Sequence, residues 1–180
     1  MKKWIVAVVS GVVSFAVVLG ITHLATRPSA RPGEYLSRQY RVAITPPSGW
    51  ETLEDTMGAV VAFRAPQTDP GATFLENVNL VVESVPAGVD VDRYAQLGLD
   101  LLMKISNDVE VLDSSPAALG GIPGRRMELM MQQGQFPLHL VQRCVVIDAR
   151  AYVFTATALQ SDFAACEPTF EQVFASVRFP

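Results

Sequence analysis

Residues 125–159 read RRMELMMQQG QFPLHLVQRC VVIDARAYVF TATAL, and this stretch decides the fold. It divides into three apolar segments and two short connectors, namely 125–132, 136–147 and 151–159, with Gln133–Gln135 and Asp148–Arg150 between them. Connectors this short join antiparallel neighbours, so the three segments are predicted to form an antiparallel meander. Apolar residues occupy both faces of 136–147, which predicts that helices cover both sides of the sheet.

The sequence on either side of the meander predicts more strands and two helices. Alternation or compact apolar runs indicate strands at 40–45, 58–64 and 77–85. Apolar residues at helical spacing predict a helix with the stripe Tyr94, Leu97, Gly98, Leu101, Leu102 and Ile105, capped by Asp90 or Asp92. A last helix is predicted to begin near Pro168, with Phe170, Val173, Phe174 and Val177 as its stripe. The acids Glu51, Glu54 and Asp55 are interpreted as a solvated loop.

The N-terminus carries a long uncharged segment. Trp4–Ala25 follows Lys2 and Lys3 and spans 22 residues, about 33 Å as a helix, which matches the core of a bilayer. We expect an uncleaved single-pass anchor in a bacterial inner membrane, and a cleaved signal peptide stays open as the alternative. Basic residues after the span count against export of the domain, whereas the three-residue tail favours it. We expect the domain in the periplasm.

These features predict an α+β protein with a central antiparallel sheet sandwiched by helices (α/β/α), preceded by an N-terminal transmembrane helix. The predicted units are an anchor or signal at 1–25, a linker at 26–37 and a domain at 38–180. An apolar fraction of 49% and a charged fraction of 18% are typical of a globular chain. Residues beyond 30 carry 11 basic and 18 acidic side chains, a net charge of −7 that disfavours binding to nucleic acid.

Side chains suited to catalysis or metal binding are scarce in the predicted domain. His139 is its single histidine, so a histidine-rich zinc site is excluded, and no serine lies in a G-x-S-x-G motif. The glycines of 120–124 lead into a strand and lack the Lys-Ser/Thr of a phosphate loop, so they indicate a turn. We therefore predict no catalytic residue, no metal ligand and no cofactor, and interpret His139 as structural or exposed.

Two groups of side chains are candidate functional features. Met127, Met130, Met131 and Phe136 form a soft apolar group, which indicates either core filling or a pliable groove for an apolar ligand or a partner segment. Cys144 and Cys166 are the two cysteines of the chain. An even pair in an oxidising compartment predicts a disulfide, and two buried thiols are the alternative.

Four stretches of the sequence, taken in order, resemble the PsbP-like superfamily, which includes the DcrB-type bacterial lipoproteins. They are Pro47-Ser48-Gly49-Trp50, the turn at 119–126, the strand start at 150–155 and the ending at 170–179. The chain departs from the lipoprotein members because no cysteine precedes Cys144. The resemblance implies an α/β/α sandwich and a non-enzymatic accessory or binding role. We expect an unknown protein partner at the membrane, with carriage of a lipid or another apolar ligand as the alternative.

Overall fold

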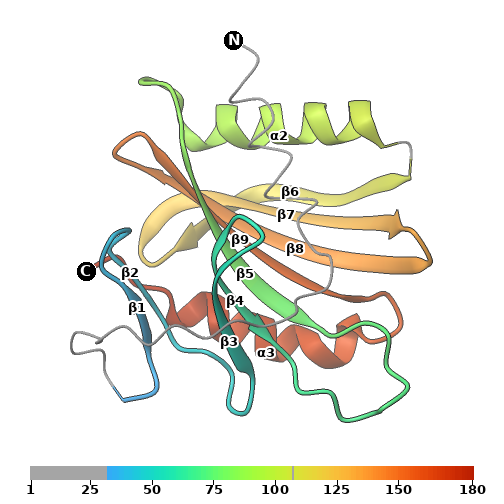
Figure 1. Cartoon of the computed structure of the whole chain (residues 1–180). Coiled ribbons are helices and arrows are strands. Elements are labelled where there is room, and N and C mark those ends of the chain that lie inside the picture. Colours follow the sequence, from blue (N-terminus) through green and yellow to red (C-terminus); the bar gives the residue numbers. More distant parts are fainter. Residues whose placement is uncertain (1–31, 107) are drawn as a thin grey trace.

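The computed structural model describes residues 32–106 and 108–180, which form one large sheet with a helix on each face (Figure 1). The predicted anchor at 1–25 lies outside the described residues. Within the described ranges, no helix has the length and the apolar character needed to cross a bilayer.

The large sheet is antiparallel throughout, in the order β3-β4-β5-β9-β8-β7-β6. Its strands are β3 (Glu51–Thr56), β4 (Ala59–Arg64), β5 (Asn77–Ser84), β6 (Val109–Leu119), β7 (Ile122–Gln133), β8 (Phe136–Ile147) and β9 (Arg150–Leu159). The meander predicted from 125–159 is confirmed, because β7, β8 and β9 are adjacent and antiparallel. Strand β9 returns to the middle of the sheet and pairs with β5 along eight residues.

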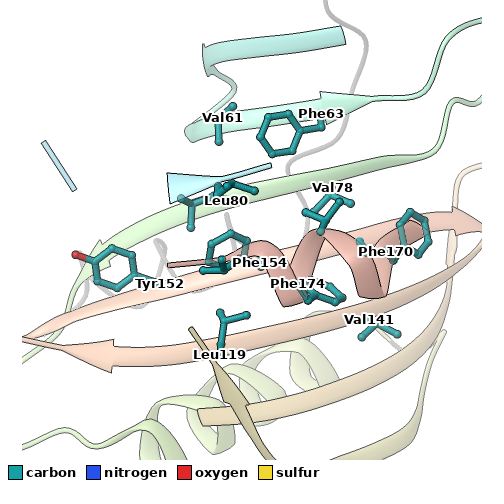
Figure 2. Close-up of a cluster of buried hydrophobic side chains, with 14 of the residues drawn as sticks. Val61, Phe63, Val78, Leu80, Leu119, Val141, Tyr152, Phe154, Phe170 and Phe174 are labelled. Carbon is teal, nitrogen blue, oxygen red and sulfur yellow. The ribbon is translucent and has the colours of Figure 1, made fainter. Parts of the chain in front are cut away.

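The helices α2 (Val91–Ile105) and α3 (Phe163–Ser176) cover opposite faces. Helix α2 packs on β7 and β8, whereas α3 packs on β9 from the other side (Figure 1). Alternate residues of β9 therefore enter different cores: Tyr152 and Phe154 belong to the cluster under α3, and Val153 belongs to the cluster under α2. Figure 2 shows Phe170 and Phe174 of α3 close to the apolar side chains of the strands. The predicted α+β sheet with helices on both faces is confirmed.

A small second sheet next to α3 brings residues near the start of the described chain to its C-terminal residues. Strands β1 (Tyr35–Ser37) and β2 (Val42–Ile44) pair with each other, and Ala43 of β2 also pairs with Arg178. Strand β1 lies inside the range predicted as a linker, so ordered structure begins earlier than the predicted boundary at 38. Ala43 is fully buried together with both its neighbours, because β2 is covered by α3 as well as by β1.

Two predicted helix details are wrong. Helix α2 buries Tyr94, Ala95, Leu99 and Leu102. Ile105 of the predicted stripe is 52% exposed, because no other described segment covers that side of the last turn. Helix α3 begins at Phe163, five residues before Pro168. The missing N–H of Pro168 costs one backbone hydrogen bond, and the burial of Phe163 to 5% exposure compensates for that loss.

The predicted loop at Glu51, Glu54 and Asp55 is also wrong. These residues belong to β3, the edge strand that pairs with β4. Their side chains are exposed because an edge strand can keep a face and one side in water. Glu51 accepts a hydrogen bond from Arg64 at 2.5 Å across that pair.

Candidate binding surfaces

Exposed apolar side chains gather where α2 ends and β6 begins. In residues 32–106 and 108–180, the large apolar side chains that are more than a third exposed are Met57, Met103, Ile105, Val111 and Leu112. Met57 lies in the β3–β4 turn at one edge of the sheet. The other four, which we call the α2–β6 patch, belong to α2 and to β6 at the opposite edge.

Helical phase and strand register bring Met103 towards Val111. Asp92 and Met103 are eleven residues apart, about three helical turns, so they lie on the same side of α2. Arg125 links this side to β6, because its guanidinium lies 3.6 Å from the Asp92 carboxylate and donates a hydrogen bond of 2.9 Å to the Ser114 carbonyl. Val111 points to the same sheet face, since its register partner on β7 belongs to the core under α2.

Strand β6 has features that interrupt pairing along its outer edge. The register shifts between Val111 and Asp113, which marks a bulge, and Pro116 has no N–H to donate. Glu110 adds an exposed charge at the start of the strand. The α2–β6 patch is therefore suited to docking through side chains and not to the addition of a long continuous strand.

The four residues predicted as an apolar groove do not line one surface. Met127 and Met131 are 3% and 8% exposed and fill the core on the α2 side of the sheet. Phe136 lies on the same side, with its ring centroid 5.6 Å from that of Phe74. Met130 points to the other face, because successive side chains of a strand alternate. Core filling, the other interpretation of this group, describes Met127 and Met131.

The predicted disulfide between Cys144 and Cys166 is wrong. Both thiols are free. Cys144 is buried in the cluster under α2, whereas Cys166 packs against the cluster under α3, so the sheet separates them. A disulfide needs Cα atoms within about 4.4–6.8 Å, which side chains on opposite faces do not provide. Burial raises the pKa of Cys144 to about 12, and burial also raises the pKa of Cys166.

His139 ends a ladder of charged side chains on the α3 face of β6, β7 and β8. Its Nε2 lies 2.7 Å from Glu128, which accepts a hydrogen bond of 2.7 Å from Arg126, and Arg126 donates another of 2.9 Å to Asp113. Burial acts to raise the pKa of Glu128, but the hydrogen bonds from Arg126 and His139 outweigh it and lower that pKa. The His139 ring stacks on Phe163 with centroids 3.5 Å apart, which ties the strands to the start of α3.

Acidic side chains at the other end of α2 have structural partners. Asp90 accepts a hydrogen bond of 2.8 Å from the Arg93 N–H, which confirms the predicted cap. The Tyr94 hydroxyl donates to Glu83 at 3.2 Å and joins α2 to β5. Burial raises the pKa of Glu83, with the Tyr94 hydrogen bond opposing that rise. Among the described residues, no group of three or more His, Cys, Asp or Glu side chains is placed to hold a metal ion.

The fold is that of the PsbP-like α/β/α proteins. The chain is similar to cyanobacterial PsbP from Synechocystis, with a TM-score of 0.63 at 14% identity over 82% of this chain and 91% of that one. It is also similar to Mycobacterium tuberculosis LpqN, with a TM-score of 0.64 at 16% identity over 77% and 83%. A third similar structure is the yeast Ran-binding protein Mog1p, with a TM-score of 0.56 at 9% identity over 81% and 94%.

The sequence identifies the particular family within this class. The sequence profile of the DcrB family matches residues 43–176, which is most of the domain. The chain therefore belongs to the DcrB family, and the resemblance seen in the sequence is confirmed. A comparison with curated proteins found no match.

Proposed function

We propose that this chain is a non-enzymatic accessory protein, tethered to a bacterial inner membrane by residues 4–25, whose domain binds a partner protein through the α2–β6 patch. The observation that carries the proposal is the gathering of Met103, Ile105, Val111 and Leu112 at one end of the domain. Groups of exposed apolar side chains at one end of a domain are typical of interaction sites. Two similar structures support a binding role: Mog1p is described as a Ran-binding protein, and LpqN as a protein involved in cell envelope biogenesis.

The position of the patch favours a protein partner over the lipid bilayer. Strand β1, near which the described chain begins, and the junction of α2 with β6 lie at opposite ends of the molecule (Figure 1). A tether that enters at β1 would hold the α2–β6 patch away from the membrane surface. Asp108 and Glu110 are exposed beside the patch and outnumber Lys104, which is exposed on the last turn of α2. The expected partner surface is therefore apolar, with lysine or arginine facing these acids at its border.

The structure does not favour the alternative function, a carrier of a lipid or another apolar ligand. It depended on a groove at Met127 and Met131, and both side chains are buried in the core. The surface cavities described below are lined by other residues. Protein binding is therefore the function that we propose.

Site-specific photo-crosslinking in native membranes tests this function. A photoreactive amino acid at Met103 or Leu112 of the full-length chain should give a discrete crosslinked product, and Val111→Glu in the same chain should abolish it. The matched control is position 57, because Met57 is 44% exposed but lies at the other edge of the sheet. Met57→Glu should leave the product unchanged. Equal crosslinking from position 57, or a product that survives Val111→Glu, would contradict the proposed surface.

A further inference from the structure

A surface cavity of about 710 Å³ lies between the turn that follows β2 and the outer side of α3. None of the described residues that line it carries a charge. Its polar lining consists of hydroxyl and amide side chains: Thr45, Ser48, Thr169, Gln172 and Ser176. Its apolar lining includes Trp50, the adjacent prolines and Val173. The volume falls within the range of about 300–1,000 Å³ typical of small-ligand sites.

The walls of the cavity are fixed by backbone geometry. The Trp50 N–H donates to the Pro47 carbonyl at 3.2 Å, and Gly49 has a φ of 79°, which a type II turn requires at this place. On the other wall, the Ser176 hydroxyl donates to the Val173 carbonyl at 2.7 Å and accepts from the Thr45 N–H at 3.0 Å. The end of β2 is thereby held against α3, so the cavity is present before any ligand arrives.

Trp50 stands between this cavity and a second one. The second cavity, of about 360 Å³, is lined by Trp50 together with Arg64 and Gln67 among others. Trp50 meets Phe170 edge-on, with ring centroids 6.4 Å apart and planes at 89°. Because Trp50 borders both cavities and is partly exposed, its indole is suited to serve as a flat platform for a ligand.

The lining selects an uncharged, hydroxyl-rich ligand. Among the described residues of the larger cavity, a phosphate or carboxylate would find no cation, and a cationic ligand would find no acid. Hydroxyl and carboxamide groups both donate and accept hydrogen bonds, as sugar hydroxyls do. A proline-rich peptide is the competing occupant, but grooves for such peptides are lined by several aromatic side chains. Trp50 is the one aromatic side chain among the described residues of this lining.

We propose that this cavity binds an uncharged saccharide, with a sugar ring stacked on Trp50 and its hydroxyls bonded by Ser48, Thr169 and Gln172. Within the described residues, no hydrogen bond already occupies these three side chains. The site lies on α3 and the β2–β3 turn, apart from the α2–β6 patch. Saccharide binding and partner binding are therefore independent proposals, and the failure of one does not affect the other. In the location proposed above, the domain would meet neutral glycans of the envelope on its own side of the membrane.

Trp50 fluorescence tests the proposal directly. Trp4→Phe leaves Trp50 as the one tryptophan of the full-length chain, which is reconstituted in nanodiscs to avoid glycoside detergents. Titration with maltotriose, trehalose, cellotriose and chitotriose should give a saturable change in Trp50 emission with at least one of them. Trigalacturonate, a charged trisaccharide, should give none. Failure of all four neutral sugars at millimolar concentration overturns the proposal, as does a response to a proline-rich peptide alone.

A variant series locates the site. Thr169→Ala and Gln172→Ala should each weaken the responding sugar at least tenfold, since each removes a hydrogen-bonding side chain that does not hold the fold. Gln135→Ala is the matched control, because Gln135 is an exposed glutamine in the β7–β8 turn and should leave the affinity unchanged. Equal affinity in all three variants overturns the assignment to this cavity.

Discussion

Burial controls the reactivity of the two thiols. The thiolate is the reactive form of cysteine, and a pKa of about 12 leaves almost no thiolate on Cys144 near neutral pH. Cys166 is partly exposed on α3, so it can meet a reagent in water. In folded protein without reductant, we expect a charged thiol reagent to modify Cys166 and to spare Cys144 until the chain unfolds.

A time course of labelling checks this expectation. Cys166→Ser should remove the fast phase and leave the slow, unfolding-limited phase. If unreduced folded protein has no thiol that labels even after denaturation, the two cysteines are bonded and the placement of α3 on the opposite face is wrong.

The carboxyl group of Glu83 predicts a pH dependence of stability. Its pKa is raised above 4.5 in the folded state by burial, so the folded chain binds more protons than the unfolded chain just above that pH. The free energy of unfolding should therefore fall as pH rises from about 4.5 through the folded pKa. Glu83→Gln keeps an acceptor for Tyr94 and should remove this fall.

Urea unfolding of the wild type and the variant across a series of pH values measures the effect. Asp113→Asn serves as a control of opposite sign, because hydrogen bonds from Ser115 and Arg126 lower the pKa of Asp113. The stabilising effect of that carboxylate should be lost as pH falls below 3.8. If the difference in the free energy of unfolding between wild type and Glu83→Gln does not change with pH, the raised pKa of a buried Glu83 is contradicted.

At the scale of elements, β7 and β8 approach each other closely at one glycine. A Cβ on Gly124 would lie 2.3 Å from the Cys144 carbonyl oxygen and 2.8 Å from the Val145 Cγ1. Gly124→Ala should therefore destabilise the fold by about 1–3 kcal/mol, as overpacking of a core does. In Gly71→Ala the nearest contact is an ordinary 3.4 Å to Asp69, so that control should be near neutral in urea unfolding. Equal stabilities would contradict the strand spacing.

The apolar side chains of the two helices differ in how much they contribute to the stability of the fold. Phe174 is 1% exposed at the centre of the α3 face, so Phe174→Ala should cost about 3–5 kcal/mol. Ile105 ends α2 and is 52% exposed, so Ile105→Ala should change stability by less than about 0.5 kcal/mol. Thermal unfolding of both variants distinguishes the exposed Ile105 of the structure from the predicted apolar stripe, in which Ile105 would be buried. A large loss of stability in Ile105→Ala would contradict the exposed position and support the predicted stripe.

At the scale of the whole molecule, the anchor remains a prediction that fractionation can test. We expect the full-length chain to stay with membranes after an alkaline wash, because its 22-residue apolar segment would span the bilayer core as a helix. Protease added from the outside should digest the domain. A mature protein that begins near residue 26 or 31 would instead indicate a cleaved signal peptide.

The two proposed surfaces lie on different parts of the molecule. The α2–β6 patch lies at one edge of the sheet, and the cavity at Trp50 lies beside β2 and α3. The sequence drew attention to the cavity region, since the Pro47–Trp50 turn is one of the stretches that carry the family resemblance. The sequence did not indicate the first surface, because Ile105 belongs to the predicted apolar stripe of the helix and Met103 lies outside it. The fold shows that both side chains are exposed among the described residues.

The sequence by itself determined the fold class, the antiparallel meander and an acidic cap at Asp90 or Asp92, of which the structure uses Asp90. These follow from connector length, alternation and local hydrogen bonding, which are properties of neighbouring residues. Only the tertiary structure decided the rotation of α2, the start of α3 at Phe163, the pairing of Glu51–Thr56 as an edge strand and the separation of Cys144 from Cys166. Each of these depends on which sheet face or strand meets a segment distant in the chain, and the free energy of that burial exceeds the local preferences that a sequence pattern records.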